Sequence, residues 1–226
     1  MKYEIILLII GLTLFLALGI IELVFCYREN AKLRKIFKCF SITILGIVLS
    51  IVFPDKPFIY VAAFLYTIGD FFLIFKGKKY LTIGTNFFLL AQVSVITQII
   101  ISLNPTLVFT DFIYLIIIYL LFFTLFKIFF YKKMTFKYFL PACGYFAILI
   151  LGQYISFLYA LKTNSNYLFL TSLGYTIFIF SDLFVLRQNF VVTKPREDFL
   201  IMLTYYLAVV FVLMGLVFSF TNLFLF

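Results

Sequence analysis

The chain has 226 residues, of which 65% are hydrophobic and only 12% are charged. Soluble domains have roughly 45–50% apolar and about 25% charged residues, so this composition excludes a soluble globular protein and indicates one integral membrane domain over residues 1–226. The net charge of +9 does not indicate a nucleic-acid partner, because the basic residues lie in short segments between apolar runs, as topology signals do.

Eight apolar runs predict membrane-spanning helices, since a span needs about 20 mostly apolar residues. They cover residues 3–27, 36–53, 58–75, 81–103, 111–131, 138–161, 167–186 and 199–225. Turn-forming residues separate several runs, at 54–57, 104–105 and 162–166. The first run is longer than a signal-peptide core and its basic residues follow it, so we expect it to be retained. The predicted fold class is all-α, a polytopic bundle of eight transmembrane helices.

The positions of the basic residues support this count. All but three of the 18 lie in the first, third, fifth and seventh loops or at the adjoining ends of the runs. The exceptions are Lys2, Lys56 and Lys162. By the positive-inside rule the odd loops are cytoplasmic, so both termini are predicted to face outside. We expect the membrane to be the cytoplasmic membrane of a bacterium.

Two aspartates, Asp70 and Asp182, lie within the third and seventh apolar runs. A carboxylate at the bilayer centre costs about 2.5–3.5 kcal/mol on insertion scales, so such residues usually mark a function. They precede Lys76 and Arg187 by six and five residues, which places both about 8–9 Å inside the cytoplasmic end. Their separation of 112 residues, half the chain, fits two parallel four-helix halves.

Small and polar residues accompany the two aspartates. Gly69 would let a neighbouring helix approach, and Ser181 can hydrogen-bond across a helix interface. Further candidates for substrate binding are Lys38, Gln92, Tyr205, Tyr206 and Arg187. A basic rim of Lys38, Lys76, Lys78, Lys79 and Arg187 could hold an anionic lipid headgroup. The alternative interpretations are that the aspartates only tie helices together and that the basic residues only set topology.

Carboxylates are the best candidates for chemistry in this chain. A close pair in a medium of low dielectric constant keeps one proton while the other group ionises, which supplies a general acid and a general base. The chain has no histidine, and its three cysteines, Cys26, Cys39 and Cys143, lack the spacing of metal ligands. We therefore expect no metal and no cofactor.

Three segments of the chain resemble the YhhN family of membrane proteins, which includes the lysoplasmalogenases. They are Gly69-Asp70 followed by Gly84, Phe88 and position 92; residues 174–182 followed by Phe190; and Thr204–Ala208. The chain departs from the family pattern at Gln92, where the family usually has His, at Val209, where it usually has Gln, and at Cys39, where proline tends to occur.

The resemblance implies a hydrolase that cleaves the vinyl-ether bond of lysoplasmalogens to a fatty aldehyde and glycerophosphoethanolamine or glycerophosphocholine. It implies Asp70 and Asp182 as catalytic residues and a membrane lysophospholipid as substrate, and it indicates no oligomeric state. Two alternatives stay open. Intramembrane carboxylates also suit a proton-coupled small-molecule or lipid transporter, and the departures at Gln92 and Val209 suit a lipid-binding member without turnover.

Overall fold

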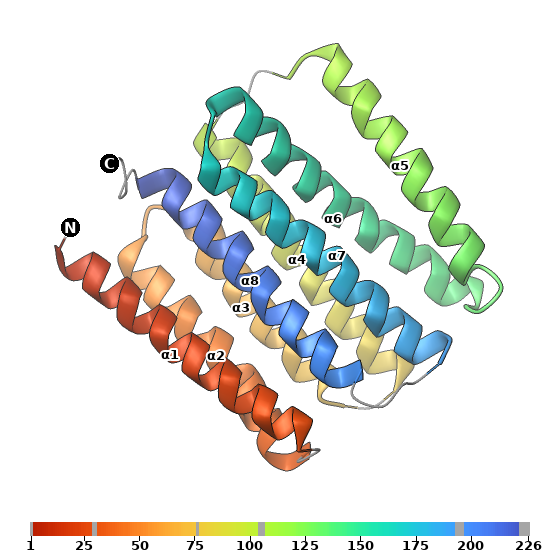
Figure 1. Ribbon diagram of the computed structural model, residues 1–226, viewed down its shortest axis with the longest axis horizontal. Helices are drawn as coiled ribbons and strands as arrows, with labels where there is room; N and C mark the ends of the chain where they lie inside the picture. The colour runs from red at the N-terminus through yellow and green to blue at the C-terminus, as the bar shows by residue number, and fades with distance from the viewer. Residues whose placement is uncertain (1, 29–30, 76, 104–106, 193–196, 222–226) are drawn as a thin grey trace. The chain divides into compact units, whose positions relative to one another are not determined.

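The computed structural model describes residues 2–28, 31–75, 77–103, 107–192 and 197–221, with side chains except at 2, 31–35 and 221. This part of the chain forms eight α-helices and no strand, which confirms the predicted all-α class (Figure 1). The helices are α1 (Lys2–Tyr27), α2 (Ala31–Val52), α3 (Pro57–Leu73), α4 (Lys78–Leu103), α5 (Phe109–Phe130), α6 (Phe136–Thr163), α7 (Asn166–Phe190) and α8 (Glu197–Thr221).

Six helices, α1 and α4–α8, are long and apolar enough to cross a membrane. The other two contain shorter apolar stretches, Ile36–Val52 in α2 and Pro57–Leu73 in α3. At 1.5 Å per residue, 17 residues cover about 26 Å, slightly less than the hydrocarbon core of about 30 Å. The count of eight spans and the orientation of the termini therefore stay predictions.

Local sequence sets the helix ends. The predicted turn at 54–57 is confirmed, and Pro57 is the first residue of α3, where its missing N–H and fixed φ are favourable. The helix α6 ends at Thr163, two residues later than its apolar run, and the next residue, Asn164, caps it with a φ of 52°, the left-handed conformation that asparagine tolerates. Ser165 then caps α7. The predicted turn at 104–105 lies outside the described residues.

The chain divides into two compact units, Met1–Gln98 and Ile99–Phe226. In the first unit α1 packs on α2, and α2 packs on α3 (Figure 1). A Cβ placed on Gly69 of α3 would lie 3.2 Å from the carbonyl oxygen of Gly84 on α4, and one on Gly84 would lie 3.0 Å from the carbonyl oxygen of Gly69. These two glycines therefore allow α3 and α4 to approach closely.

In the second unit α6 packs on α7, and α7 packs on α8. Glycines again stand at the closest approaches: Gly152 faces the ring of Tyr175, Gly174 faces the backbone of Val212, and Gly215 faces α7. Small residues at such points let membrane helices gain dispersion energy from backbone contact. The close packing of α6, α7 and α8 fixes the positions from which their polar side chains extend.

The helix α5 is held differently, through aromatic side chains that contact α6. Phe122 and Phe126 pack on Phe146 with ring centroids 5.5 and 5.3 Å apart, and the Tyr119 hydroxyl donates to the carbonyl of Ala147 at 2.8 Å. Most of α5 is exposed and apolar, including Ile116, Ile117, Leu120 and Leu121. This helix therefore offers most of its surface to lipid.

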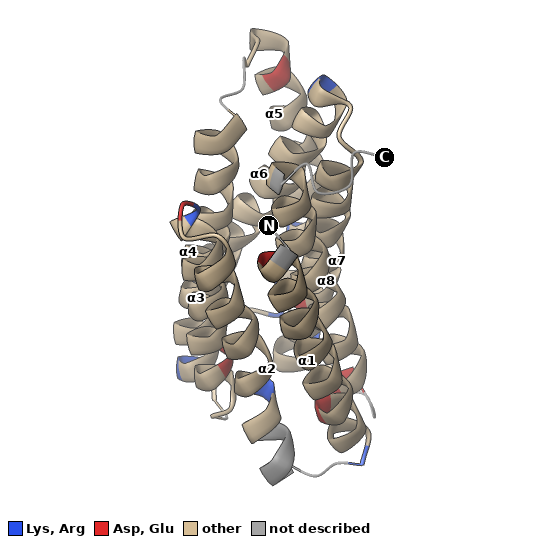
Figure 2. Ribbon diagram, turned by 90° about the vertical axis from the view of Figure 1, so that its left-hand side faces the viewer, with Lys and Arg blue, Asp and Glu red and all other residues tan. Residues whose placement is uncertain are grey.

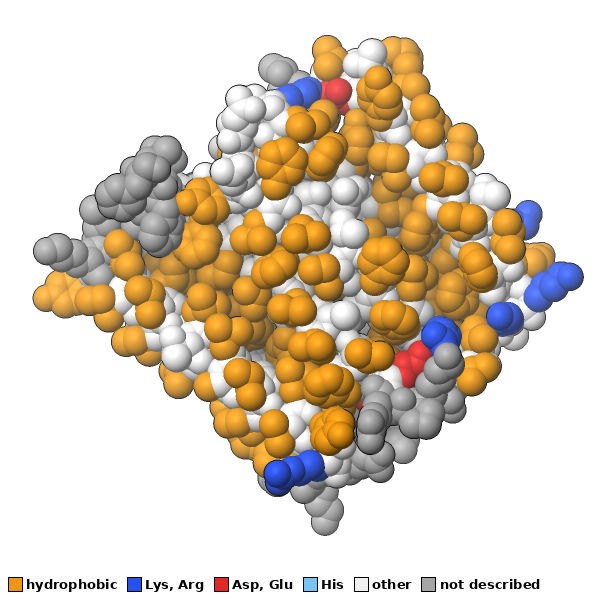
Figure 3. Space-filling view, viewed as in Figure 1, with side chains coloured by type: hydrophobic (Ala, Val, Ile, Leu, Met, Phe, Trp, Pro, Cys, Tyr) orange, Lys and Arg blue, Asp and Glu red, His pale blue; other side chains and the backbone are white. Residues whose placement is uncertain are grey.

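Exposed apolar side chains and terminal charges support an integral membrane protein. Figure 3 shows hydrophobic side chains over the middle turns of the helices on the face that it presents. Figure 2 shows that charged residues lie mostly near the ends of the helices. An apolar middle with charged ends is the pattern of helices that span a bilayer.

Two glycines of α6 provide a matched test of its packing. Alanine at Gly152 would overlap the buried ring of Tyr175, whereas alanine at Gly144 would meet nothing within 4 Å. We expect Gly152→Ala to lower the free energy of unfolding by about 1–3 kcal/mol, and Gly144→Ala to raise it by about 0.5–1 kcal/mol, since alanine favours helix. Denaturant unfolding in detergent micelles measures both, and equal effects would contradict the packing described.

Candidate functional site

The first candidate carboxylate, Asp70 on α3, is completely buried and forms an ion pair across a helix interface. The Nζ of Lys38 on α2 lies 3.1 Å from its Oδ1, and the side chain of Lys38 is itself only 12% exposed. A lone charge in such surroundings would cost several kcal/mol, so the opposite charges compensate each other. The structure thus places Lys38 in a buried ion pair with a predicted catalytic residue.

The position of Asp70 follows from the packing of its neighbours. Gly69 lies against the ring of Phe88 as well as the backbone of Gly84. Phe88 also contacts the ring of Tyr66, one turn before Asp70, with centroids 5.9 Å apart. Gly69 therefore acts in the structure through the close approach of α3 and α4, and a contact between Gly69 and substrate stays a prediction.

Gln92 on α4 is buried but lies at another level of the first unit. It is eight residues beyond Gly84, so it is displaced by about 12 Å along the helix axis from the point where α4 meets Gly69. Its side chain is 0% exposed. Neither its Nε2 nor its Oε1 has a hydrogen-bond partner among the described residues. Gln92 is thus a buried amide that still has a donor and an acceptor to offer.

The second candidate carboxylate, Asp182 on α7, is half-buried and faces α6. The hydroxyl of Tyr145 on α6 donates to its Oδ2 at 2.5 Å. The preceding residue, Ser181, is buried and donates to the carbonyl of Ile201 on α8 at 3.1 Å. Adjacent residues of α7 therefore bond to two different helices, and the interface hydrogen bond predicted for Ser181 is present.

The remaining predicted residues of the second unit lie along α8 and the end of α7. Tyr205 and Tyr206 are buried, and the ring of Tyr205 meets Phe178 edge to face. The Nε of Arg187 lies 3.7 Å from Oε1 of Glu197, which is only 4% exposed. Arg187 therefore connects the end of α7 to the start of α8. Lys76, also predicted for the basic rim, lies outside the described residues.

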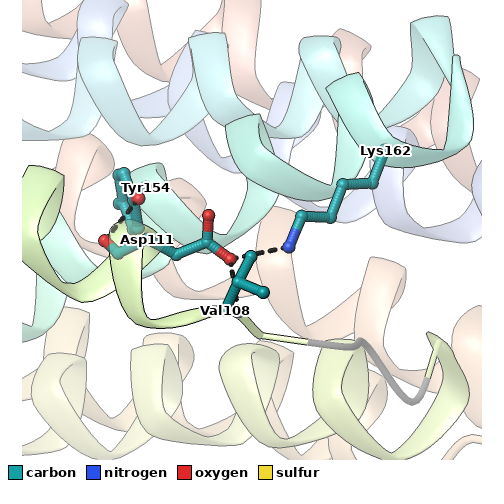
Figure 4. A network of polar contacts seen from close by, with 4 residues as sticks. All are labelled: Val108, Asp111, Tyr154 and Lys162. Carbon is teal, nitrogen blue, oxygen red and sulfur yellow. Dashed lines mark hydrogen bonds and ion pairs between the residues drawn. The ribbon is translucent and has the colours of Figure 1, made fainter.

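Sequence reasoning missed a polar network between α5 and α6 (Figure 4). Oδ2 of Asp111 accepts from Nζ of Lys162 at 2.6 Å and from the backbone N–H of Val108 at 2.9 Å. The hydroxyl of Tyr154 donates to the backbone carbonyl of Asp111 at 2.6 Å. Asp111 is the third residue of α5, a position at which carboxylates commonly cap helices. This position in the sequence could have indicated that Asp111 holds the start of the helix. The network fastens the start of α5 to the end of α6.

The described residues offer carboxylates, phenols, an amide and cations for chemistry. In that part of the chain no three His, Cys, Asp or Glu side chains are grouped so as to hold a metal ion. Asp70 and Asp182 each have a polar partner on a neighbouring helix, so both are oriented. Such groups can donate or accept protons and can stabilise a cation.

Comparison with known protein families gives one match. The model of the YhhN family matches residues 33–216, about four-fifths of the chain, which confirms the resemblance seen in the sequence. Comparisons with curated proteins and with solved structures found no match. The matched range contains both aspartates, Lys38, Tyr145 and Gln92.

The Lys38–Asp70 ion pair can be tested by removing its cation. We expect Lys38→Met to lower the free energy of unfolding by about 3–5 kcal/mol, because the Asp70 carboxylate then stays buried without its ammonium. The double variant Lys38→Met/Asp70→Asn should recover most of this loss. Lys56→Met is the control: its pair with Asp55, 69% exposed, should contribute less than about 1 kcal/mol. Equal losses at Lys38 and Lys56 would contradict the buried pair.

The network at Asp111 makes a separate prediction about α5. Asp111→Asn should weaken the bond to Lys162 and speed amide hydrogen exchange in the first turn of α5, since a hydrogen bond to a charged group is worth about 1.5–3 kcal/mol. Tyr154→Phe removes one bond between neutral groups and should have a smaller effect, about 1 kcal/mol. Hydrogen exchange followed by mass spectrometry measures both, and unchanged exchange in Asp111→Asn would show that other contacts hold α5.

Proposed function

The chain belongs to the YhhN family, and we propose that it is a membrane hydrolase that cleaves the vinyl-ether bond of lysoplasmalogens. The family is associated with hydrolase activity. One observation carries the proposal: two apolar helices each contain an aspartate whose carboxyl group is oriented by a side chain of a neighbouring helix. Intramembrane carboxylates are costly, and function is the usual reason for their presence.

The proposed reaction needs only an acid, a carboxylate and water. The acid transfers its proton to the β-carbon of the vinyl ether, which leaves an oxocarbenium-like cation beside the ether oxygen. The carboxylate stabilises this cation and takes a proton from the water that adds to it. The resulting hemiacetal collapses to a fatty aldehyde and a glycerophospho alcohol as its hydroxyl proton passes to the leaving oxygen. The proton that the carboxylate took from water then returns to the acid, so one water is consumed and both groups are restored.

We assign the two roles from the partners of the aspartates. Asp70 is the proposed carboxylate, because its pair with the Lys38 ammonium is strongest when both groups are charged. Asp182 is the proposed acid. Its partner, the Tyr145 phenol, can donate to a carboxylate and can equally accept from a protonated carboxyl group. Tyr145 can therefore keep Asp182 oriented in both protonation states.

Substrate contacts belong to the same proposal. The basic side chains Lys38 and Arg187 would contact the phosphate of the headgroup. An arginine has five N–H donors, so Arg187 can hold a phosphate as well as the Glu197 carboxylate that its Nε faces. Gln92, Tyr205 and Tyr206 would contact other parts of the lipid, with the Gln92 amide offering a buried donor and acceptor. Gly69 and Ser181, which precede the two aspartates, would contribute to substrate binding next to them.

The shape of the aspartate-bearing helices supports hydrolysis over transport. The helix α3 continues through Asp70 and α7 continues through Asp182 without a break. Secondary transporters typically place their substrate and ion sites at discontinuous helices, where unwound backbone binds the ligand. Asp70 and Asp182 instead act from regular helices, which suits fixed acid–base groups.

The proposal predicts a specific product. Purified protein in lipid nanodiscs should release fatty aldehyde from 1-alkenyl-lysophosphatidylethanolamine and no fatty acid from the 1-acyl counterpart, followed by mass spectrometry. Asp70→Asn and Asp182→Asn should each lower the rate by about 10²–10⁴-fold, the usual contribution of a general acid or base. Asp55→Asn, at a residue of the exposed turn between α2 and α3, is the matched control and should keep full activity.

Other products would redirect the assignment. Fatty acid from the acyl lipid would indicate ester cleavage at the same residues. Lipid binding without any product would indicate a family member without turnover, and proton-dependent uptake into liposomes that Asp70→Asn abolishes would indicate transport. Activity that survives both aspartate variants would overturn the proposed acid and base.

A further inference from the structure

Four exposed lysines gather at the turn that joins α5 to α6 in the second unit. This lysine cluster consists of Lys127, Lys132, Lys133 and Lys137. The sequence has no Asp or Glu between Asp111 and Asp182, so no acidic residue of the turn or of the adjoining helix turns balances these charges. Figure 3 shows basic side chains gathered where α5 meets α6. The lysine cluster is therefore a patch of uncompensated positive charge.

No member of the lysine cluster forms an ion pair within the described part of the chain. Other cations there are paired with carboxylates, at Lys38–Asp70, Lys162–Asp111 and Arg187–Glu197. In the cluster, Nζ of Lys127 is 5.9 Å from the ring centroid of Tyr131, and Nζ of Lys137 is 6.0 Å from that of Tyr138. Lys137 is also the second residue of α6, where the helix dipole is already positive. An anion bound here would relieve the repulsion between these charges.

The turn itself is firmly structured. Phe130 and Met134 are buried, so the turn is anchored on the protein interior. The backbone N–H groups of Lys133 and Met134 both donate to the carbonyl of Phe130, at 2.9 and 3.0 Å. Beside the turn the rings of Phe126 and Phe139 join α5 to α6, with centroids 5.4 Å apart. The lysines therefore extend from an ordered backbone, which lowers the entropy lost when several of them bind one ligand.

Exposed apolar side chains continue from the lysine cluster along both helices. They are Leu121, Leu125, Ile128 and Phe129 on α5, and Phe136 and Leu140 on α6. A phospholipid matches both surfaces, because its phosphate can contact lysines while its acyl chains lie along the apolar side chains. Basic clusters at the ends of membrane helices commonly bind anionic lipids in this way. A soluble anion would match only the lysines.

We propose that the lysine cluster binds an anionic lipid with two phosphate groups, of the diphosphatidylglycerol class. Charge complementarity favours this occupant, because Lys127 lies at the end of α5, Lys137 at the start of α6, and the other two lysines between them. Two linked phosphates can pair with lysines of both helices at once, and the link raises affinity through effective concentration. The bound lipid would hold the end of α5 against α6, with residues that take no part in the proposed hydrolysis.

A role in topology alone makes a different prediction. Positively charged loops set the orientation of a membrane protein whether or not they bind a particular lipid. In that role the lysines would attract anionic lipids only through net charge. The loss of two lysines at any turn on the same side of the membrane would then weaken this attraction equally. The effect of position is thus the readout that separates the two roles.

Native mass spectrometry of the full-length protein from detergent micelles measures its affinity for diphosphatidylglycerol. Lys132→Gln/Lys133→Gln should weaken binding about 30-fold, the usual contribution of two lysines near an anionic lipid surface. Lys132→Arg/Lys133→Arg keeps the charge and should bind as the wild type does. Lys78→Gln/Lys79→Gln, which removes the same charge at the start of α4, is the matched control and should leave the affinity unchanged. Equal weakening by the two glutamine variants would overturn the inference.

Hydrogen exchange locates the bound lipid independently of these variants. Addition of diphosphatidylglycerol should slow amide exchange at residues 127–139 and leave the start of α4 unchanged. Phosphatidylglycerol at equal total phosphate should protect the turn less, and equal protection would contradict the choice of a lipid with two phosphates. Inorganic phosphate should not compete, since it has no acyl chains to contact α5. Competition by inorganic phosphate would show that the turn binds a soluble anion instead.

Discussion

The cost of a carboxylate in apolar surroundings is the constraint on which the arrangement of these helices depends. Several acidic side chains of the described residues are held by a polar side chain on a helix that is adjacent in sequence, and Asp198 of α8, which accepts from Gln188 of α7, is one of them. The other contacts are Lys38–Asp70 between α2 and α3, Lys162–Asp111 between α5 and α6, Tyr145–Asp182 between α6 and α7, and Arg187–Glu197 between α7 and α8. Asp70, Asp111 and Glu197 are the buried members of these contacts, and removing their partners would leave them buried without a counter-charge, so these contacts also fix the register of their helices.

Close packing makes such contacts possible within each unit. A hydrogen bond or ion pair weakens steeply when its geometry is lost, so the helices that carry the partners have to be held within a fraction of an ångström. Glycines do this by admitting neighbouring backbone or rings, at Gly69 and Gly84 in the first unit and at Gly152 and Gly174 in the second. The helix α5 packs on α6 through aromatic side chains and is also held by its polar network with α6.

The sequence predicted the helices and the costly residues but not their partners. Apolar length is a local property, so all eight helices and the proline turn before α3 were found from it. The end of α7 was predicted at 186 but lies at Phe190, because polar residues such as Arg187 and Gln188 can continue a helix beyond its apolar run. Which of the 16 tyrosines meets Asp182 depends on how α6 packs on α7, and no local pattern marks Tyr145.

The geometry of the first unit also bears on the departure from the family pattern at Gln92. Direct proton transfer needs heavy atoms about 2.6–3.2 Å apart, whereas Gln92 is displaced by about 12 Å along α4 from the level of Gly69. Neither polar atom of Gln92 has a hydrogen-bond partner among the described residues, so Gln92 makes no hydrogen bond to Asp70 in the structure. The departure at Gln92 therefore leaves the Lys38–Asp70 ion pair in place. The departure changes the polar group that is buried about two turns beyond Gly84 along α4. At this position the Gln92 amide offers a bound molecule one donor group and one acceptor group.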